Sequence, residues 1–196
     1  MKQEIEKIFC HYKKKKITEE KFKSSAVLIP LFYNKDSLHV LFTKRSDEVN
    51  FHKGQVCFPG GGPEPVDAGL LQTALREAEE EIGLKAKGVE ILGELDDSLT
   101  LTSGYVISPF VAFIPYPYPF KLDNKEVEEI FSVPLSALMG PDDRKELNFR
   151  EDYHPTGDKS GPGYAYEYEG HVIWGATARI LKQFVELLRS ESGSLC

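Results

Sequence analysis

The feature that most constrains the fold of this chain is a glycine-rich turn followed by an acidic helical segment. The turn is Gly60-Gly61-Gly62, and the segment is LREAEEEIG at residues 75–83. Four of the five residues from Glu77 to Glu81 are glutamates. Like charges one helical turn apart repel each other, and anions in the last turn oppose the helix dipole. The segment therefore carries a cost in stability that a binding function would explain.

The glutamates are expected on one side of the helix. Asp67 is a favourable N-cap residue and Gly83 a favourable stop, so we expect the helix to run from Asp67 to the residue before Gly83. Its core face carries Leu71, Ala74, Leu75, Ala78 and Ile82. At roughly 100° per residue, Glu77, Glu80 and Glu81 then converge on one patch beside that face.

A divalent cation would turn this patch of carboxylates into a binding site. Mg²⁺ prefers oxygen ligands, takes one or two carboxylates, and keeps its other positions for water and phosphate oxygens. The three glycines let the backbone approach a metal or a phosphate closely, because no side chain intervenes. The alternative is a solvated charged face, in which Arg76 offsets part of the repulsion by pairing with Glu80. The turn, the helix and the spacing together favour the metal site.

The composition limits the classes of function. The chain has 196 residues and a formal net charge of −7, which fits one acidic globular domain and argues against a nucleic-acid binder. A small anionic substrate is not excluded, because a bound metal ion can supply positive charge. The three cysteines are scattered, no apolar run is long enough to span a membrane, and the first residues lack a signal-peptide pattern. We therefore expect a cytoplasmic protein with reduced thiols and no membrane partner.

Hydrophobic periodicity and turn residues place the expected elements along the chain. Strands are expected at residues 25–33, 38–43, 55–58, 89–95, 105–114 and 126–133. Helices are expected at residues 2–13, 67–82 and 175–188, with a short one around Ser136. The polar, turn-rich stretch 140–163 is expected to be a loop over the site.

The mixture of these elements indicates the fold class. Strands and helices follow one another without a regular βα alternation, so we expect an α/β (α+β) protein with a mixed central sheet flanked by helices. Residues 1–24 are expected to form an N-terminal helix and a linker, in which Lys13 to Lys16 are solvated. Residues 25–196 are expected to form one domain.

The acidic segment resembles the signature of the Nudix hydrolases. That signature reads Gly, five residues, Glu, seven residues, then Arg-Glu-U-x-Glu-Glu-x-Gly-U, where U is a bulky aliphatic residue. Residues 76–84, REAEEEIGL, are similar to its second half, with Ala78 at a U position. In the first half Ala68 stands where the glutamate is expected, and Asp67 follows Gly61 by six residues, so the box carries one extra residue. The resemblance implies a Nudix-like α/β/α sandwich.

A second pattern upstream resembles one branch of this family, the coenzyme A diphosphatases. The pattern reads Leu-Leu-Thr-x-Thr-Ser/Ala, three residues, Arg, three residues, Gly, three residues, Phe-Pro-Gly-Gly. Residues 41–46, LFTKRS, are followed at the right intervals by Gly54 and by FPGG at residues 58–61. Two positions differ, because Arg45 replaces the second threonine and Asn50 stands where the arginine is expected.

The resemblance implies roles for individual residues. Glu77, Glu80 and Glu81 would be metal ligands, joined by the carbonyl group of Gly61, and the cofactor would be Mg²⁺ or Mn²⁺. Glu77 and Glu80 would also take part in catalysis, and Arg76 would orient a glutamate. One glutamate, in the box or on a later loop, would take a proton from the attacking water. The candidates on the later loop are Glu126, Glu128 and Glu129, with Glu126 preferred.

By the same resemblance, the expected reaction is hydrolysis of coenzyme A or its thioesters to 3′,5′-ADP and (acyl-)4′-phosphopantetheine. Gly60 would contact the substrate, and Arg45 or Lys53 would bind the 3′-phosphate. A second hypothesis keeps the enzyme but changes the substrate to ADP-ribose, NADH or another nucleoside diphosphate derivative. A third hypothesis, of another class, is a catalytically silent Nudix module that binds a nucleotide. In each case the partner is a small-molecule nucleotide, and a homodimer is expected because dimers are common in the family.

Overall fold

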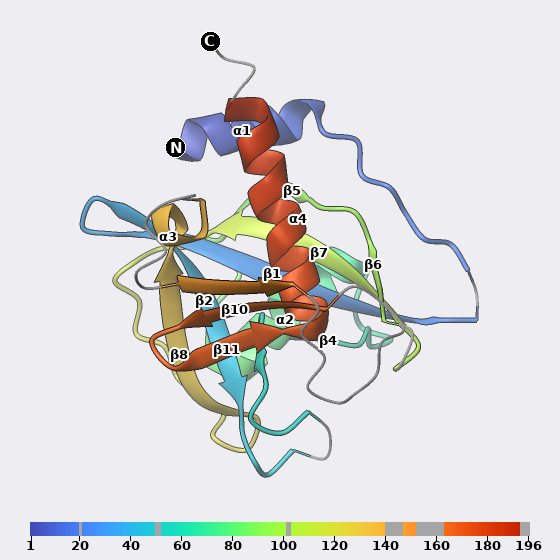
Figure 1. Cartoon of the computed structure of the whole chain (residues 1–196). Coiled ribbons are helices and arrows are strands. Elements are labelled where there is room, and N and C mark those ends of the chain that lie inside the picture. The colour runs from blue at the N-terminus through green and yellow to red at the C-terminus, as the bar shows by residue number, and fades with distance from the viewer. Residues whose placement is uncertain (20, 50–51, 101–102, 140–146, 152–162, 193–196) are drawn as a thin grey trace.

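The computed structural model describes residues 1–19, 21–49, 52–100, 103–139, 147–151 and 163–192 (Figure 1). Within these ranges, eight strands form the main sheet: β1 (Lys23–Asn34), β2 (Ser37–Arg45), β3 (Val56–Cys57), β4 (Gly60–Gly61), β5 (Glu90–Glu94), β6 (Ser98–Thr100), β7 (Tyr105–Phe113) and β8 (Val127–Pro134). A second sheet contains β9 (Leu147–Glu151), β10 (Tyr164–Tyr168) and β11 (His171–Trp174). The helices are α1 (Lys2–His11), α2 (Leu70–Ile82), α3 (Leu135–Met139) and α4 (Gly175–Ser192).

The main sheet is mixed. Its central path runs β3-β2-β1-β7-β5, while β8 pairs with β2, β4 with β1 and β6 with β7. β1 and β7 are parallel and in register from Lys23 opposite Tyr105 to Leu31 opposite Phe113. The other pairs of this sheet are antiparallel. The expected mixed central sheet is confirmed.

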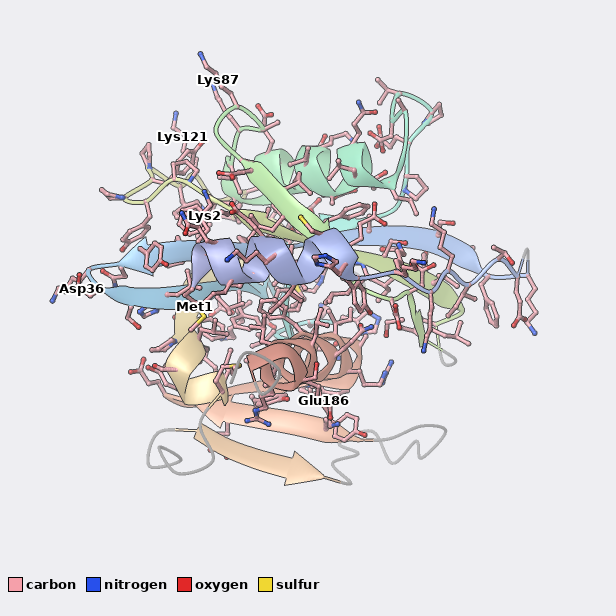
Figure 2. The ribbon with its side chains drawn as sticks, turned by 90° about the horizontal axis from the view of Figure 1, so that it is seen from above. Met1, Lys2, Asp36, Lys87, Lys121 and Glu186 are labelled. Carbon is pink, nitrogen blue, oxygen red and sulfur yellow. The ribbon has the colours of Figure 1, made fainter. Side chains whose placement is uncertain are left out.

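The sheet is covered by helices on both faces. Along β1, Leu28 and Phe32 pack with the apolar side of α2, whereas Ile29 and Leu31 pack with the apolar side of α4. Side chains alternate between the faces of a strand, so β1 contributes to two cores. Figure 2 shows the resulting layers, with α2 on one side of the sheet and α4 on the other. The α/β/α sandwich is therefore confirmed.

The second sheet corrects the expected loop over residues 140–163. Residues 147–151 form β9, which pairs with β10 from Leu147 opposite Tyr168 to Glu151 opposite Tyr164. The polar residues of this stretch favour turns, but pairing with a neighbouring strand satisfies their backbone groups. The remainder of the stretch up to residue 162 lies outside the described residues. Residues 171–174 form β11, and the last helix begins at Gly175 as expected.

The N-terminal helix packs on the edge of the main sheet. The ring of Phe9 lies directly over Gly93 of β5, where any Cβ would clash at 2.2 Å. After the helix, Lys14 is not solvated as expected, because its Nζ lies 2.7 Å from Asp97 and 3.2 Å from Glu94. Ser108 also donates a 2.6 Å hydrogen bond to Asp97. The N-terminal segment is thus fastened to the sheet by a mostly buried ion pair. None of the described helices is long and apolar enough to cross a membrane.

We expect Asp97→Asn to destabilise the fold without affecting catalysis. Burial raises the pKa of Asp97, but hydrogen bonds from Lys14 and Ser108 outweigh it and leave the pKa lowered. Loss of the charge should reduce the free energy of unfolding by about 1–2 kcal/mol, since Lys14 retains Glu94. Urea denaturation measures the change. Asp36→Asn, at the tip of the β1–β2 hairpin (Figure 2), is the control, and an equal effect of both substitutions would refute this role for Asp97.

Candidate active site

The helix that carries the glutamates begins three residues later than expected. α2 starts at Leu70, with Gly69 as its N-cap, so the prediction that Asp67 caps the helix is wrong. The carboxylate of Asp67 accepts hydrogen bonds from Thr73 and Arg76 instead. The expected stop at Gly83 is confirmed: its φ is 69°, in the left-handed region that glycine adopts readily.

Arg76 organises the polar groups around it. Its Nε lies 3.1 Å from Asp67, its Nη2 lies 3.0 Å from Glu77, and its Nη1 lies 2.8 Å from Glu80. Nη2 also donates a 2.9 Å hydrogen bond to the carbonyl group of Gly62. The expected pairing with Glu80 is confirmed. Arg76 therefore ties the glycine turn, the loop before α2 and the glutamates into one network.

Asp67 fixes this network, and its loss should reduce turnover. The hydrogen bond from Arg76 lowers the pKa of Asp67 to about 2, so the carboxylate is charged at neutral pH. We expect Asp67→Asn to lower kcat about 10-fold, because Arg76 would lose its charged anchor and orient Glu77 less well. Steady-state kinetics measure the change. Glu64→Gln, an exposed acid in the same loop, is the control, and unchanged kcat in Asp67→Asn would contradict the positioning role.

The glycine turn has no room for side chains. β4 pairs with β1 through Gly60 opposite Val27 and Gly61 opposite Ala26. A Cβ at Gly60 would lie 2.3 Å from the carbonyl oxygen of Ala26, and one at Gly61 would lie 2.4 Å from a carboxylate oxygen of Glu77. The Glu77 carboxylate thus rests directly against the backbone of Gly61. The expected close approach of the backbone to the acidic patch is present in the structure.

Glu81 is a buried carboxyl group at the centre of the site. Its residue exposure is 2%, and it accepts a 3.3 Å hydrogen bond from the backbone N–H of Gly60. Nη1 of Arg45 lies 3.9 Å from its other oxygen. Burial raises the pKa of Glu81 to about 8, Arg45 opposes that rise, and the charges of Glu77 and Glu126 add to it. A divalent cation next to this carboxyl group would favour its ionised form.

The three box glutamates differ in burial and in their partners. Burial raises the pKa of Glu77, and Arg76 partly opposes this. Glu80 differs, since its side chain is 58% exposed and paired with Arg76. Within the described part of the chain, no three acidic, histidine or cysteine side chains are close enough to hold a metal ion as they stand. The three carboxylates do not form a ready metal-binding cluster in this structure, because Arg76 bridges Glu77 and Glu80 and holds the Glu80 carboxylate in an exposed position.

The donor groups that remain nevertheless fit a hard divalent cation. The carboxylates of Glu77 and Glu81 are mainly buried, and the arginine nitrogens near them lie at 3.0 Å from Glu77 and 3.9 Å from Glu81. Carboxylate oxygens are the ligand type that Mg²⁺ and Mn²⁺ prefer. The carbonyl group of Gly61 accepts a 2.9 Å hydrogen bond from Ser25, and the backbone of Gly61 lies against the Glu77 carboxylate. These three groups would hold the ion. Glu80 would join them only by giving up its ion pair with Arg76.

The three glutamates considered as general base on the later loop, Glu126, Glu128 and Glu129, differ in their contacts. Glu128 is 3.0 Å from Lys44, and Glu129 is 3.2 Å from His171, so both carboxylates already have partners. Glu126 precedes β8, and its charge acts on both Glu77 and Glu81. Of the three, Glu126 is the one that the structure associates with the acidic patch.

The two basic candidates also differ. Arg45 ends β2 and faces Glu81, and its Nε is buried without a hydrogen-bond partner among the described residues. Lys53 is exposed in the loop between β2 and β3.

The sequence interpretation missed Ser25, whose contact with Gly61 joins residues far apart in the chain and leaves no local signal.

Comparisons with known proteins agree with this geometry. Residues 22–153 match the family model described as NUDIX domain. A Nudix hydrolase NudL from Yersinia enterocolitica is 37% identical over 162 residues, covering 83% of this chain and 80% of that protein. NudL from Yersinia pestis is 38% identical over 162 residues, covering 83% and 78%. Both relatives carry the name Uncharacterized Nudix hydrolase NudL.

A solved structure supports the fold. The MutT/nudix family protein from Enterococcus faecalis superposes with a TM-score of 0.55 at 18% sequence identity, covering 88% of this chain and 64% of that one. The α/β/α sandwich and the glycine turn with its acidic helix define a hydrolase of phosphorus anhydrides. The chain belongs to the Nudix hydrolase family.

Proposed function

We propose that this enzyme hydrolyses the diphosphate bond of coenzyme A or its thioesters, giving 3′,5′-ADP and (acyl-)4′-phosphopantetheine. One observation carries the proposal: Gly60, from the FPGG end of the upstream pattern, donates a 3.3 Å backbone hydrogen bond to Glu81 of the acidic helix. The two patterns, which resemble the family signature and its coenzyme A branch, therefore meet at one site. Nudix hydrolysis of a nucleoside diphosphate derivative is the broader activity that contains this reaction.

The residues of the site divide the work of such a hydrolysis. Bound Mg²⁺ or Mn²⁺ would neutralise the diphosphate and lower the pKa of a bound water. Glu77 and Glu81, with the Gly61 carbonyl group, would hold the metal, and Arg76 would keep Glu77 in place through its 3.0 Å contact. The backbone at Gly60 would lie close to the substrate, as no side chain fits there.

Glu126 is the residue that we assign as general base. Its charge acts on Glu77 and Glu81, and it is exposed, so an incoming water can reach it. A carboxylate removes a proton from water most effectively when its partners do not already hold it. Glu128 and Glu129 are engaged by Lys44 and His171. Glu80, by contrast, would serve as a further metal ligand after releasing Arg76.

A substrate panel tests the proposal. The purified protein is incubated with Mg²⁺ or Mn²⁺ and, separately, coenzyme A, acetyl-coenzyme A, ADP-ribose or NADH, and the products are identified by mass. Release of 3′,5′-ADP from coenzyme A is the expected result. AMP from ADP-ribose or NADH, with coenzyme A left intact, would overturn the substrate while keeping the chemistry. We further propose that the protein is cytoplasmic and forms a homodimer. Sedimentation of the purified protein would test the homodimer.

A further inference from the structure

Arg179 is a cation at a place that does not favour one. It lies at the start of the second turn of α4, near the positive end of the helix dipole, and its side chain is half-buried. Burial lowers the pKa of its guanidinium group. Both effects disfavour a positive charge here, just as the end of α2 disfavours its glutamates. A charge retained at such a cost calls for a partner.

The contacts of Arg179 within the described part of the chain do not supply that partner. Its Nη2 donates one long hydrogen bond, 3.4 Å, to the carbonyl group of Leu99, and the phenol of Tyr164 also acts on its charge. None of the described carboxylates pairs with it. A guanidinium group has five N–H donors, so most of them are unused. None of its nitrogens is among the described atoms that are fully buried without a partner, so its unused donors keep some exposure.

Another arginine on the same helix shows what a structural role looks like. Arg189 donates hydrogen bonds of 3.0 to 3.2 Å to the carbonyl groups of Leu138 and Met139. These contacts fasten α4 to α3 through the guanidinium group. Arg179 makes no comparable set of contacts with the described residues, so fastening the helix does not explain it.

Arg179 lies on α4, which packs against the same end of the main sheet as the glycine turn. α4 packs against β6, and β11, which leads directly into α4, packs against β3. Across the sheet, Leu99 is opposite Val106, Val106 is opposite Ser24, and Ser25 contacts Gly61. Three strand spacings therefore separate Leu99 from Gly61, or roughly 14 Å at about 4.8 Å each. This path runs within the sheet: Arg179 reaches Leu99 from the α4 face, whereas Glu77 and Glu81 reach the glycine turn from the α2 face. A nucleotide that meets both would have its diphosphate at the glycine turn and a second phosphate farther along the same end of the sheet.

We propose that Arg179 forms an anion subsite for a phosphate group remote from the scissile diphosphate, and that in coenzyme A this group is the 3′-phosphate. The inference rests on the proposed function, which supplies a substrate with such a phosphate. The planar guanidinium group matches phosphate oxygens with two parallel N–H donors. The subsite would thus distinguish coenzyme A from dephospho-coenzyme A, which lacks this group. It would also assign to Arg179 the task that Arg45 and Lys53 were expected to perform.

The test compares these two substrates in Arg179→Gln. We expect kcat/KM for coenzyme A to fall about 10- to 100-fold, mainly through KM, because charge-assisted hydrogen bonds to the phosphate are lost. The value for dephospho-coenzyme A should stay within about twofold of wild type. Arg179→Lys should recover part of the loss. Arg189→Gln removes a charge from the same helix and should not change the preference between the two substrates.

Direct binding separates failure of the subsite from failure of the proposed function. Calorimetry is used to measure the dissociation constants of 3′,5′-ADP and 5′-AMP for wild type and Arg179→Gln, with circular dichroism to verify folding. Arg179→Gln should weaken 3′,5′-ADP about 10-fold or more and leave 5′-AMP unchanged. Equal binding of 3′,5′-ADP by the two proteins would overturn the subsite, whether or not coenzyme A is hydrolysed. Selective weakening without any turnover of coenzyme A would keep the subsite and overturn the substrate.

Discussion

Glu77→Gln should abolish most of the catalytic activity while leaving the protein folded. The substitution keeps the size of the side chain but replaces the carboxylate that we propose as a metal ligand with a neutral amide. Loss of groups that merely support a metal ligand already costs about 10- to 100-fold, so loss of the ligand itself should lower kcat by about 10³-fold. The contact with Gly61 can be retained, because Gln occupies nearly the same volume.

A neighbouring glutamate provides the control for this substitution. Glu79→Gln changes the same residue type in the same turn of α2, at an exposed position outside the network of Arg76. It should keep kcat within about twofold of wild type. Steady-state kinetics with the best substrate of the panel measure both variants. Comparable activity of Glu77→Gln and Glu79→Gln would show that Glu77 is not a metal ligand.

The metal-free protein should become less stable as the pH rises from about 5 to about 8.5. The pKa of Glu81 is about 8 in the folded protein, against an ordinary value of 4.5. Between these values the folded protein holds a proton that the unfolded chain has released, so the free energy of unfolding falls with increasing pH. The loss should be on the order of 2–4 kcal/mol across this window, because burial separates the two pKa values by more than three pH units. Glu77, whose pKa is also raised, adds in the same direction.

Thermal unfolding in the presence of a chelator measures this dependence. Glu81→Gln carries no titratable group at that position, so its melting temperature should change much less over the same range. At the alkaline end of the range, saturating Mg²⁺ should raise the melting temperature of the wild-type protein again, since the ion binds the ionised carboxyl groups of the folded state. Parallel pH profiles for wild type and Glu81→Gln would mean that Glu81 is not the source of the dependence.

The acidic patch was predictable from the sequence because its key residues are close together in the chain. Glu77 and Glu81 lie one turn apart on α2, and helical periodicity alone puts them on one side. The glycine turn was predictable for the same reason, since glycine permits close contact with neighbouring backbone. Gly83 ended the helix as expected.

The departures arise from contacts between distant residues. Arg76 has four polar partners. Its pairing with Glu80 follows from helical spacing, but its contacts with Asp67 and with the carbonyl group of Gly62 depend on how the preceding loop folds. Asp67 belongs to that network rather than to the helix cap, although its position nine residues before Arg76 hints at the link.

The second sheet was missed for a different reason. β9 lies in a stretch rich in turn-forming residues, and its pairing with β10 depends on a partner farther along the chain. The alternation of Tyr164, Tyr166 and Tyr168 in β10 was the available signal for a strand.

The account rests on a divalent cation held by Glu77 and Glu81, and direct binding of Mn²⁺ tests it best. Electron paramagnetic resonance of free Mn²⁺ is recorded as wild type, Glu77→Gln, Glu81→Gln and Glu79→Gln are added, without substrate. Wild type and Glu79→Gln should deplete the free ion equally, while each of the other two variants should bind it at least about 10-fold more weakly. Equal depletion by all four proteins would contradict the metal site, and with it the explanation for the glutamates at the end of α2.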